Sequence, residues 1–298
     1  AVSAVYYQAE RCRREGYLRQ ARSLFFRALD LATDENGERL PIASHVLVGL
    51  GEIAREWNEL DSAERFAHQG IELAERWAPV AGIEAYLTLA RIRQAQGDWY
   101  GADEMIAAMR QVVGGFKATG LVDRMVDLAE AWMQIAQGKL DGPRRWAERR
   151  GFSGDVDPQA LERNDHVAIR RVRKNEYPVV ARLWMAESRP SEALALLEAA
   201  LPLVERMNRI GLVIEYQILI SLAAQMLGQR ERAMRSLERA LVLAEPAGYL
   251  RIFLDEGEPI ARLLHEAASC RIQPEYVERL LAAFTAGEAS GNTCQPLG

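Results

Sequence analysis

The stretch VVGGFKATG, residues 112–120, places a lysine after two glycines and is the nearest approach to a phosphate-binding motif. A nucleotide-binding P-loop requires the order Gly-Lys-Ser/Thr, because the loop amides and the lysine contact the phosphates and the hydroxyl contacts Mg²⁺. Here Lys117 follows Phe116 and precedes Ala118, so both positions beside the lysine lack the required residue. The sequence therefore predicts a turn between helices at this point and no nucleotide site.

Histidine and cysteine, the usual metal ligands and nucleophiles, are few and scattered. They are His45, His68, His166, His265, Cys12, Cys270 and Cys294. None falls in an HExxH or CxxC motif, and no serine lies in a G-x-S-x-G motif. We therefore expect no catalytic residue, no metal site, no cofactor and no disulfide, and we do not expect an enzyme. This cysteine usage fits a reducing, cytoplasmic compartment.

The composition favours a folded domain without a nucleic-acid-binding surface. The 298 residues are 49% hydrophobic and 27% charged, which allows a sizeable core. The formal net charge is −5 and the pI is near 5.6, whereas nucleic-acid-binding domains usually carry a basic footprint. No apolar run approaches the roughly 20 residues of a membrane-spanning helix. We expect neither DNA binding by this chain itself nor a membrane partner.

An alanine recurs at equivalent places in five similar stretches, and we call these alanines the anchors. They are Ala21, Ala63, Ala102, Ala193 and Ala233. The residue twelve positions before each anchor is small in every stretch, being Ala9, Gly51, Ala90, Ala181 and Ser221. A weaker copy has Pro143 at the anchor position and Ala131 twelve residues earlier. Small residues at this offset allow two antiparallel helices to pack closely, as in tetratricopeptide repeats.

This repeat predicts an all-α fold, a tetratricopeptide-like superhelix (α-solenoid) of about six helix pairs plus C-terminal helices. The expected pairs cover residues 3–32, 42–77, 80–114, 120–150, 172–207 and 210–245. The expected domains are the repeat superhelix at 1–245, a capping segment with C-terminal helices at 246–287, and a flexible tail or linker at 288–298.

The first helix of each pair should line a concave face, which is the expected binding surface of such a superhelix. Side chains eight and eleven positions before each anchor should face inward. The candidate ligand-binding residues at these positions are Glu10, Arg13, Glu52, Arg55, Arg91, Trp132, Arg182 and Met185. A groove that combines apolar walls with a few polar groups suits a small ligand or a peptide. The alternative is that these side chains only pack against neighbouring repeats.

Two other surfaces are open to interpretation. The arginine-rich stretches at residues 144–150 and 170–174 form either a basic patch for a phosphate or acidic partner, or a solvated face balanced by acidic neighbours. Phe26, Trp77 and Trp146, on second helices, are candidates for an exposed apolar surface. Such a surface would favour the alternative function of a structural protein–protein interaction scaffold that senses no ligand.

The stretch EPAGYLRIFLDEGEPIARLLHEAA, residues 245–268, interrupts the helical pattern with two prolines and two glycines. We expect its apolar part, YLRIFL, to cap the exposed end of the last repeat, as terminal repeats require. Pro259 suits the first turn of a new helix at 258–269, and a further helix is expected at 274–286.

This stretch, following a repeat that ends in LERALVLAEP, resembles the end of the superhelical domain in MalT-like regulators. These are the large ATP-dependent members of the LuxR family of bacterial transcription activators. The likeness is close over residues 239–264 and loose over the repeats, from about residue 5 to residue 245.

The resemblance implies a parent protein with an N-terminal NTPase, a helical-repeat sensor and a C-terminal helix-turn-helix. No Walker motif precedes the repeats and no helix-turn-helix follows residue 264, so we expect this chain to be the repeat domain alone. ATP and DNA would then be bound only through parent domains absent from it. The implied role is to bind a small-molecule inducer or a regulatory protein and thereby control oligomerisation of the parent, with self-association as a further interaction.

Overall fold

The computed structural model describes residues 2–115, 120–152 and 167–291, with side chains throughout except at 167–174 and 287–291. Three predicted features lie outside this described part. They are Lys117 and its turn, the side chains of the second arginine-rich stretch at 170–174, and residues 292–298 of the expected tail.

The described residues form α-helices and short 3₁₀ helices (η) joined by turns, and no strand occurs among them apart from an isolated bridge between Thr33 and Arg39. The helices of the six expected pairs are α1 (Val2–Arg14), α2 (Leu18–Leu31), α3 (Ala43–Glu56), α4 (Leu60–Trp77), η1 (Pro79–Gly82), α5 (Ile83–Ala95), α6 (Trp99–Gly115), α7 (Gly120–Ala136), α8 (Asp141–Arg149), α10 (Val167–Ala186), α11 (Pro190–Glu205), α12 (Ile210–Met226) and α13 (Arg230–Ala244). After them come η2 (Glu245–Ala247), α14 (Arg251–Leu254), α15 (Glu258–Ser269) and α16 (Pro274–Gly291). The all-α helical-repeat prediction is confirmed.

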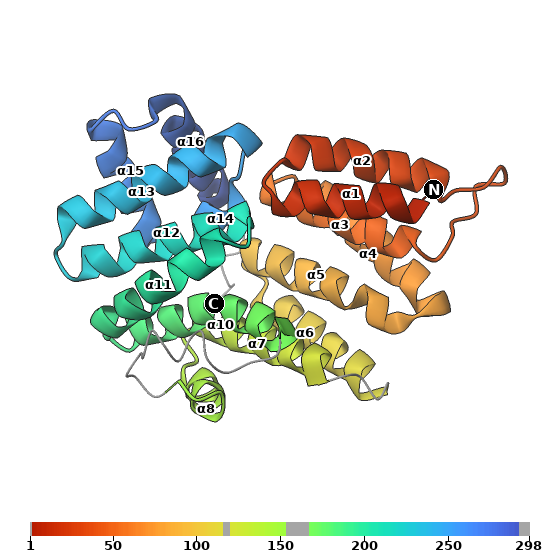
Figure 1. Ribbon diagram of the computed structural model, residues 1–298, viewed down its shortest axis with the longest axis horizontal. Coiled ribbons are helices and arrows are strands. Elements are labelled where there is room, and N and C mark those ends of the chain that lie inside the picture. Colours follow the sequence, from red (N-terminus) through yellow and green to blue (C-terminus); the bar gives the residue numbers. More distant parts are fainter. Residues whose placement is uncertain (1, 116–119, 153–166, 292–298) are drawn as a thin grey trace, which may run out of the picture. The chain divides into compact units, whose positions relative to one another are not determined.

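The chain forms two compact units, which we describe separately. The first unit contains residues 1–117, 247–255 and 282–298, and the second contains 118–246 and 256–281. In the first unit, α1 packs on α2, α3 on α4 and α5 on α6, and each pair packs on the next (Figure 1). In the second unit, α10 packs on α7 and α11, and α12 packs on α11 and α13.

The small residues that recur twelve positions before the anchors lie where two helices of a pair approach each other. A Cβ atom added at Gly51 in α3 would lie 3.4 Å from the carbonyl oxygen of Ala63 and 3.6 Å from the amide nitrogen of Ala67, both in α4. Ala63 itself is fully buried. A larger side chain at residue 51 would therefore push the two helices apart, which explains why the sequence keeps a small residue there.

A tight turn ends the first helix of most pairs. At the end of α1, Gly16 has a φ of +83°, and the amide of Tyr17 donates to the carbonyl of Cys12 at 2.8 Å. This satisfies one of the carbonyls that a helix end leaves unbonded. Asn58 takes the equivalent left-handed conformation after α3, with a φ of +61°, and Asn tolerates it better than most residues.

Ion pairs connect consecutive repeats in addition to apolar packing. In the second unit, Arg232 in α13 pairs with Glu198 in α11, and Arg239 in α13 pairs with Glu205 in α11. Both pairs span 34 residues, so the two α13 arginines face α11 glutamates in the same register.

The prediction that YLRIFL caps the last repeat is wrong. Residues 247–255 belong to the first unit and pack against α3, whereas α15 packs on α12 and α13. The amide of Leu250 donates to the carbonyl of Glu56, the last residue of α3, at 3.0 Å. A contact between residues so distant in sequence depends on the tertiary fold, which local hydrophobic patterning does not encode.

Candidate functional site

Three of the predicted ligand-binding residues form one ionic cluster in the first unit. Arg13 in α1 donates to both carboxylate oxygens of Glu10, with N–O distances of 2.9 and 3.1 Å. Its Nη1 atom lies 2.8 Å from Oε2 of Glu52 in α3. The sequence offsets correctly placed these residues on one face, and the ion pairs hold the two first helices in register.

The Glu52 carboxyl of this cluster has a raised pKa. Burial raises the pKa of the Glu52 carboxyl to about 7, the charge of Arg13 opposes the rise, and the charges of Glu84 and Glu10 add to it. Protein surrounds the carboxyl, yet 31% of the Glu52 side chain remains exposed. The charge of Arg91, on α5, also lowers the pKa of Glu52, which places this predicted residue near the same cluster. The α1, α3 and α5 face therefore presents arginines and partly exposed carboxylates together.

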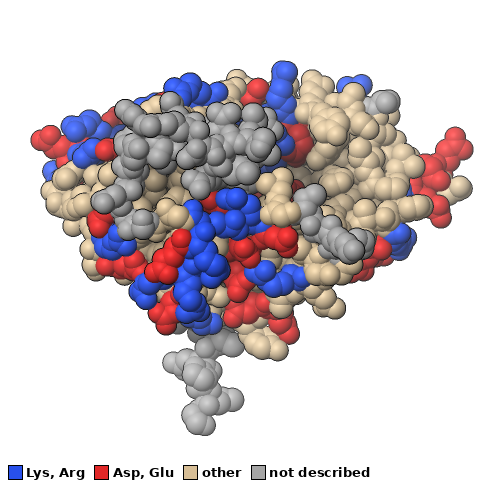
Figure 2. Space-filling view, turned by 60° about the horizontal axis from the view of Figure 1, so that its bottom comes forward, with Lys and Arg blue, Asp and Glu red and all other residues tan. Residues whose placement is uncertain are grey.

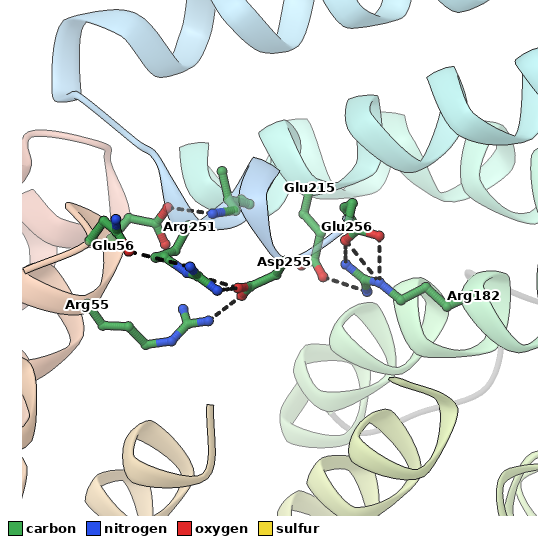
Figure 3. Close-up of polar contacts among 9 residues, drawn as sticks. Arg55, Glu56, Arg182, Glu215, Arg251, Asp255 and Glu256 are labelled. Carbon is green, nitrogen blue, oxygen red and sulfur yellow. Dashed lines mark hydrogen bonds and ion pairs between the residues drawn. The ribbon is translucent and has the colours of Figure 1, made fainter. Parts of the chain in front are cut away.

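Arg55, another predicted residue, lies at the end of α3 and is bound by the chain itself. Its side chain is 6% exposed, and its Nη2 atom forms an ion pair with Asp255 (Figure 3). Arg251 holds the other oxygen of Asp255, with its Nη2 atom at 2.5 Å and its Nε atom at 3.0 Å. Burial acts to raise the pKa of Asp255, but the charges of Arg55, Arg251 and Arg91 lower it below its usual value.

Glu56 follows Arg55 and contacts segment 247–255 through two different groups. Its main-chain carbonyl accepts from Leu250, and its side-chain Oε1 accepts from the amide of Ile252 at 2.9 Å. Burial raises the pKa of the Glu56 carboxyl to about 7, against the opposing charge of Arg55 and the hydrogen bond from Ile252. The carboxyl is therefore near its midpoint of protonation at neutral pH.

In the second unit, Arg182 in α10 binds two carboxylates. Its Nε and Nη2 atoms donate to Glu256 at 3.1 and 2.5 Å, and its Nη1 atom donates to Glu215 in α12 at 2.8 Å (Figure 3). Burial acts to lower the pKa of Arg182, but Glu256 and Glu215 raise it above its usual value. Met185 lies one turn further along α10 and is half-buried, whereas Trp132 in α7 is only 8% exposed. Trp132 thus offers little surface to a ligand.

The acidic partners of the buried arginines were not predicted from the sequence. Asp255 and Glu256 are adjacent in the chain, and each binds an arginine that had been predicted as a ligand-binding residue, Arg55 or Arg182. The only signal was the acidic stretch DEGE, directly after YLRIFL, in an otherwise apolar context. The repeat periodicity could not predict these ion pairs, because Asp255 and Glu256 lie outside the repeats.

Two arginines of the first arginine-rich stretch are paired with acidic side chains. Arg144 pairs with Asp141 at 3.1 Å and Glu187 at 2.7 Å, and Arg150 pairs with Asp127 at 3.0 Å. On the face shown in Figure 2, basic side chains lie beside acidic ones. These contacts favour the interpretation of a solvated, balanced face over that of a phosphate-binding patch.

The proposed apolar surface is only partly correct. Trp77 is 65% exposed and Phe26 is 38% exposed, but Trp146 is buried at 3% exposure. Trp146 lies in the weaker repeat copy, three residues after Pro143, and its ring contacts Phe152 at a centroid distance of 6.4 Å. The bulky residue fills the interior there, so it is not available for self-association.

Two features of the described residues bear on other functions. No helix in this part of the chain combines the length and apolar character needed to cross a membrane. Within the same residues, no group of three or more His, Cys, Asp or Glu side chains is placed to hold a metal ion.

Comparison with known proteins gives one consistent family. Residues 1–269 match the family described as the MalT-like TPR region. Over 280 residues, the chain is 23% identical to the HTH-type transcriptional regulator MalT of Serratia proteamaculans (strain 568) and 24% identical to that of Yersinia enterocolitica. These alignments cover 92% of this chain and 29% of each relative, so the chain spans under a third of the length of these relatives. The match over most of its length shows that the chain belongs to the MalT-like TPR family.

Proposed function

We propose that this chain is the regulatory repeat domain of a MalT-like, LuxR-family transcriptional activator. In this proposal, it binds a small-molecule inducer or a regulatory protein and controls oligomerisation of its parent. DNA and ATP are bound by other domains of the parent, and the repeat domain itself catalyses no reaction. Support comes from the family match and from the relatives, which are named HTH-type transcriptional regulators.

The observation that carries the proposal is the ionic cluster of Glu10, Arg13 and Glu52. These side chains are held in place by each other, and Arg13 and Glu52 keep 27% and 31% of their surface exposed. Preorganised charges of both signs can hydrogen-bond a polar ligand without the entropic cost of ordering them on binding. The same exposure leaves Arg13 and Glu52 accessible to a ligand.

Ligand binding can be tested by thermal unfolding of the chain against sugars, aromatic metabolites, nucleotides and lipids. A compound at about a hundred times its dissociation constant should stabilise the folded chain by about 2.7 kcal/mol. The shift should be lost in Arg13→Gln and Glu52→Gln. It should persist in Arg239→Gln, which removes an exposed ion pair in the other unit. If no compound gives a selective shift, a protein partner becomes the expected regulator.

A structural scaffold is the second candidate function, and the exposed Trp77 favours it. Large exposed apolar patches mark interfaces, and Trp77 would contribute to such a patch. Sedimentation at high concentration should then show self-association that Trp77→Ser reduces. A chain that stays monomeric across the accessible concentration range would exclude the scaffold function through self-association.

A further inference from the structure

Segment 247–255 contacts the end of α3 through a compact set of groups, which we call the α3-end site. The site consists of Arg55, Glu56, Trp57 and Asn58. Trp57 donates its indole N–H to the carbonyl of Ala247 at 2.8 Å, and Asn58 accepts from Arg251 at 3.4 Å. With the contacts of Arg55 and Glu56, every one of these four consecutive residues binds the segment.

The contacts are of the kind that recognise a peptide. Three of them involve main-chain groups of the segment, namely the carbonyl of Ala247 and the amides of Leu250 and Ile252. Such main-chain bonds provide affinity that does not depend on the side chains of the bound segment, and a side-chain contact then provides selectivity. Here the selective contact is the ion pair between Arg55 and a carboxylate.

The fit between Arg55 and Asp255 is incomplete. The Nε atom of Arg55 is buried and has no hydrogen-bond partner. By contrast, Arg182 in the second unit binds Glu256 through both Nε and Nη2. Arginine binds carboxylates most strongly in this two-pronged manner, so Asp255 leaves part of the recognition capacity of Arg55 unused.

Tertiary contacts, more than long regular elements, hold the segment in place. It begins at the end of η2, and α14 has only four residues. Gly248 takes a left-handed φ of +73° beside the Trp57 ring, which gives the chain the bend that aims the segment at α3. Tyr249, Phe253 and Leu254 are buried, so the docked state is the resting state.

We propose that the α3-end site is a recognition site for a short acidic peptide of a partner protein, and that residues 247–255 fill it reversibly in the resting chain. The partner peptide supplies main-chain groups to Glu56 and Trp57 and a carboxylate to Arg55. This inference rests on the proposed regulatory function and makes its regulator a protein segment.

Reversible filling is tested by hydrogen exchange on the unmodified chain. The amides of Leu250 and Ile252 report directly on docking, because both donate to Glu56. They should exchange at least tenfold faster than the buried α3 amides of Leu50 and Ile53, after correction for intrinsic rates. Equal protection of the two sets would mean that the segment leaves only on unfolding of the unit, and the proposal would be wrong.

Peptide recognition is tested with a synthetic peptide of residues 246–257. Its affinity should be at least tenfold higher for a chain in which 247–255 is replaced by nine Gly and Ser residues than for the unmodified chain. A peptide with Asp255→Asn should bind that chain at least tenfold more weakly, and a scrambled peptide should not bind. Equal affinity for the two chains, or no binding to the folded replacement chain, would overturn the proposal.

A second measurement applies if the replacement chain does not fold. Excess peptide added to the unmodified chain should accelerate exchange of its own Leu250 and Ile252 amides, because the peptide competes for the site. Unchanged exchange would count against the proposal. A positive small-molecule screen with a negative peptide result would reject the peptide site while leaving the proposed sensor function intact.

Discussion

Glu52 and Glu56 lie one helical turn apart on α3, and both carboxyls have a pKa raised to about 7 by burial. Each faces arginines, Arg13 in one case and Arg55 in the other, yet the loss of hydration outweighs these charges. The two residues differ in what they hold. Glu52 joins α1 to α3, whereas Glu56 joins α3 to segment 247–255.

These pKa values predict how stability changes with pH. The folded chain keeps both carboxyls protonated up to about pH 7, while the unfolded chain releases these protons near pH 4.5. The unfolded state therefore binds fewer protons in this window, and their contribution to the unfolding free energy falls as pH rises from about 4.5 to 7. Urea unfolding at several pH values should show that the unfolding free energy falls less with rising pH in Glu52→Gln and in Glu56→Gln than in the unmodified chain. An unchanged pH dependence in both variants would contradict the assignment.

Removal of the Arg55 guanidinium should lower the unfolding free energy of the chain. Arg55→Met leaves the buried carboxylate of Asp255 with one fewer cation, and breaking a buried pair by removing one partner typically costs about 3–5 kcal/mol. Arg251 still holds Asp255, so we expect the lower end of that range. The matched change Arg239→Met, at a pair whose arginine side chain is 55% exposed, should cost about 1 kcal/mol or less. Similar losses in the two variants, measured by urea unfolding, would argue against a buried network at Arg55.

At the scale of the elements, the helix pairs depend on small residues at their crossing points. Ala102 in α6 is an anchor and fully buried, and Ala107 in the same helix is exposed. Ala102→Leu should destabilise the chain by about 1–3 kcal/mol through overpacking. Ala107→Leu should change stability by no more than about 0.5 kcal/mol. Thermal unfolding of the two variants compares the same substitution at a buried and at an exposed position of one helix. Equal effects on stability would disprove the packing role of the anchor.

The same anchors explain why the helix pairs were predictable. A small residue at a fixed offset constrains two helices at once, so the predicted pair at 42–77 and the observed α3 and α4, ending at Trp77, nearly coincide. The offsets also placed Arg13 and Glu52 on facing helices, where they form an ion pair. Segment 247–255 was misplaced because its partners lie about 190 residues earlier in the chain, and no local period reports such contacts.

At the scale of the whole molecule, the charge balance bears on whether this chain itself binds DNA. The chain has a net charge of −5, and Arg144 and Arg150 of its first basic stretch are paired with acids. Binding to DNA is driven largely by release of counterions from phosphates neutralised by Lys and Arg. We therefore expect the isolated chain to cause no shift of DNA in a gel assay, even at low salt. A salt-sensitive shift would instead assign it a direct role in DNA binding.

The paired register of α11 and α13 has a consequence for how such an array can change over evolution. Glutamates at residues 198 and 205 face arginines that come 34 residues later. The anchors Ala193 and Ala233 are 40 residues apart, so a tandem duplication of this unit would place a copy of Glu192 opposite Glu198 and a copy of Ala199 opposite Glu205. A copied repeat would therefore lack both ion pairs at its new junction until compensating substitutions follow.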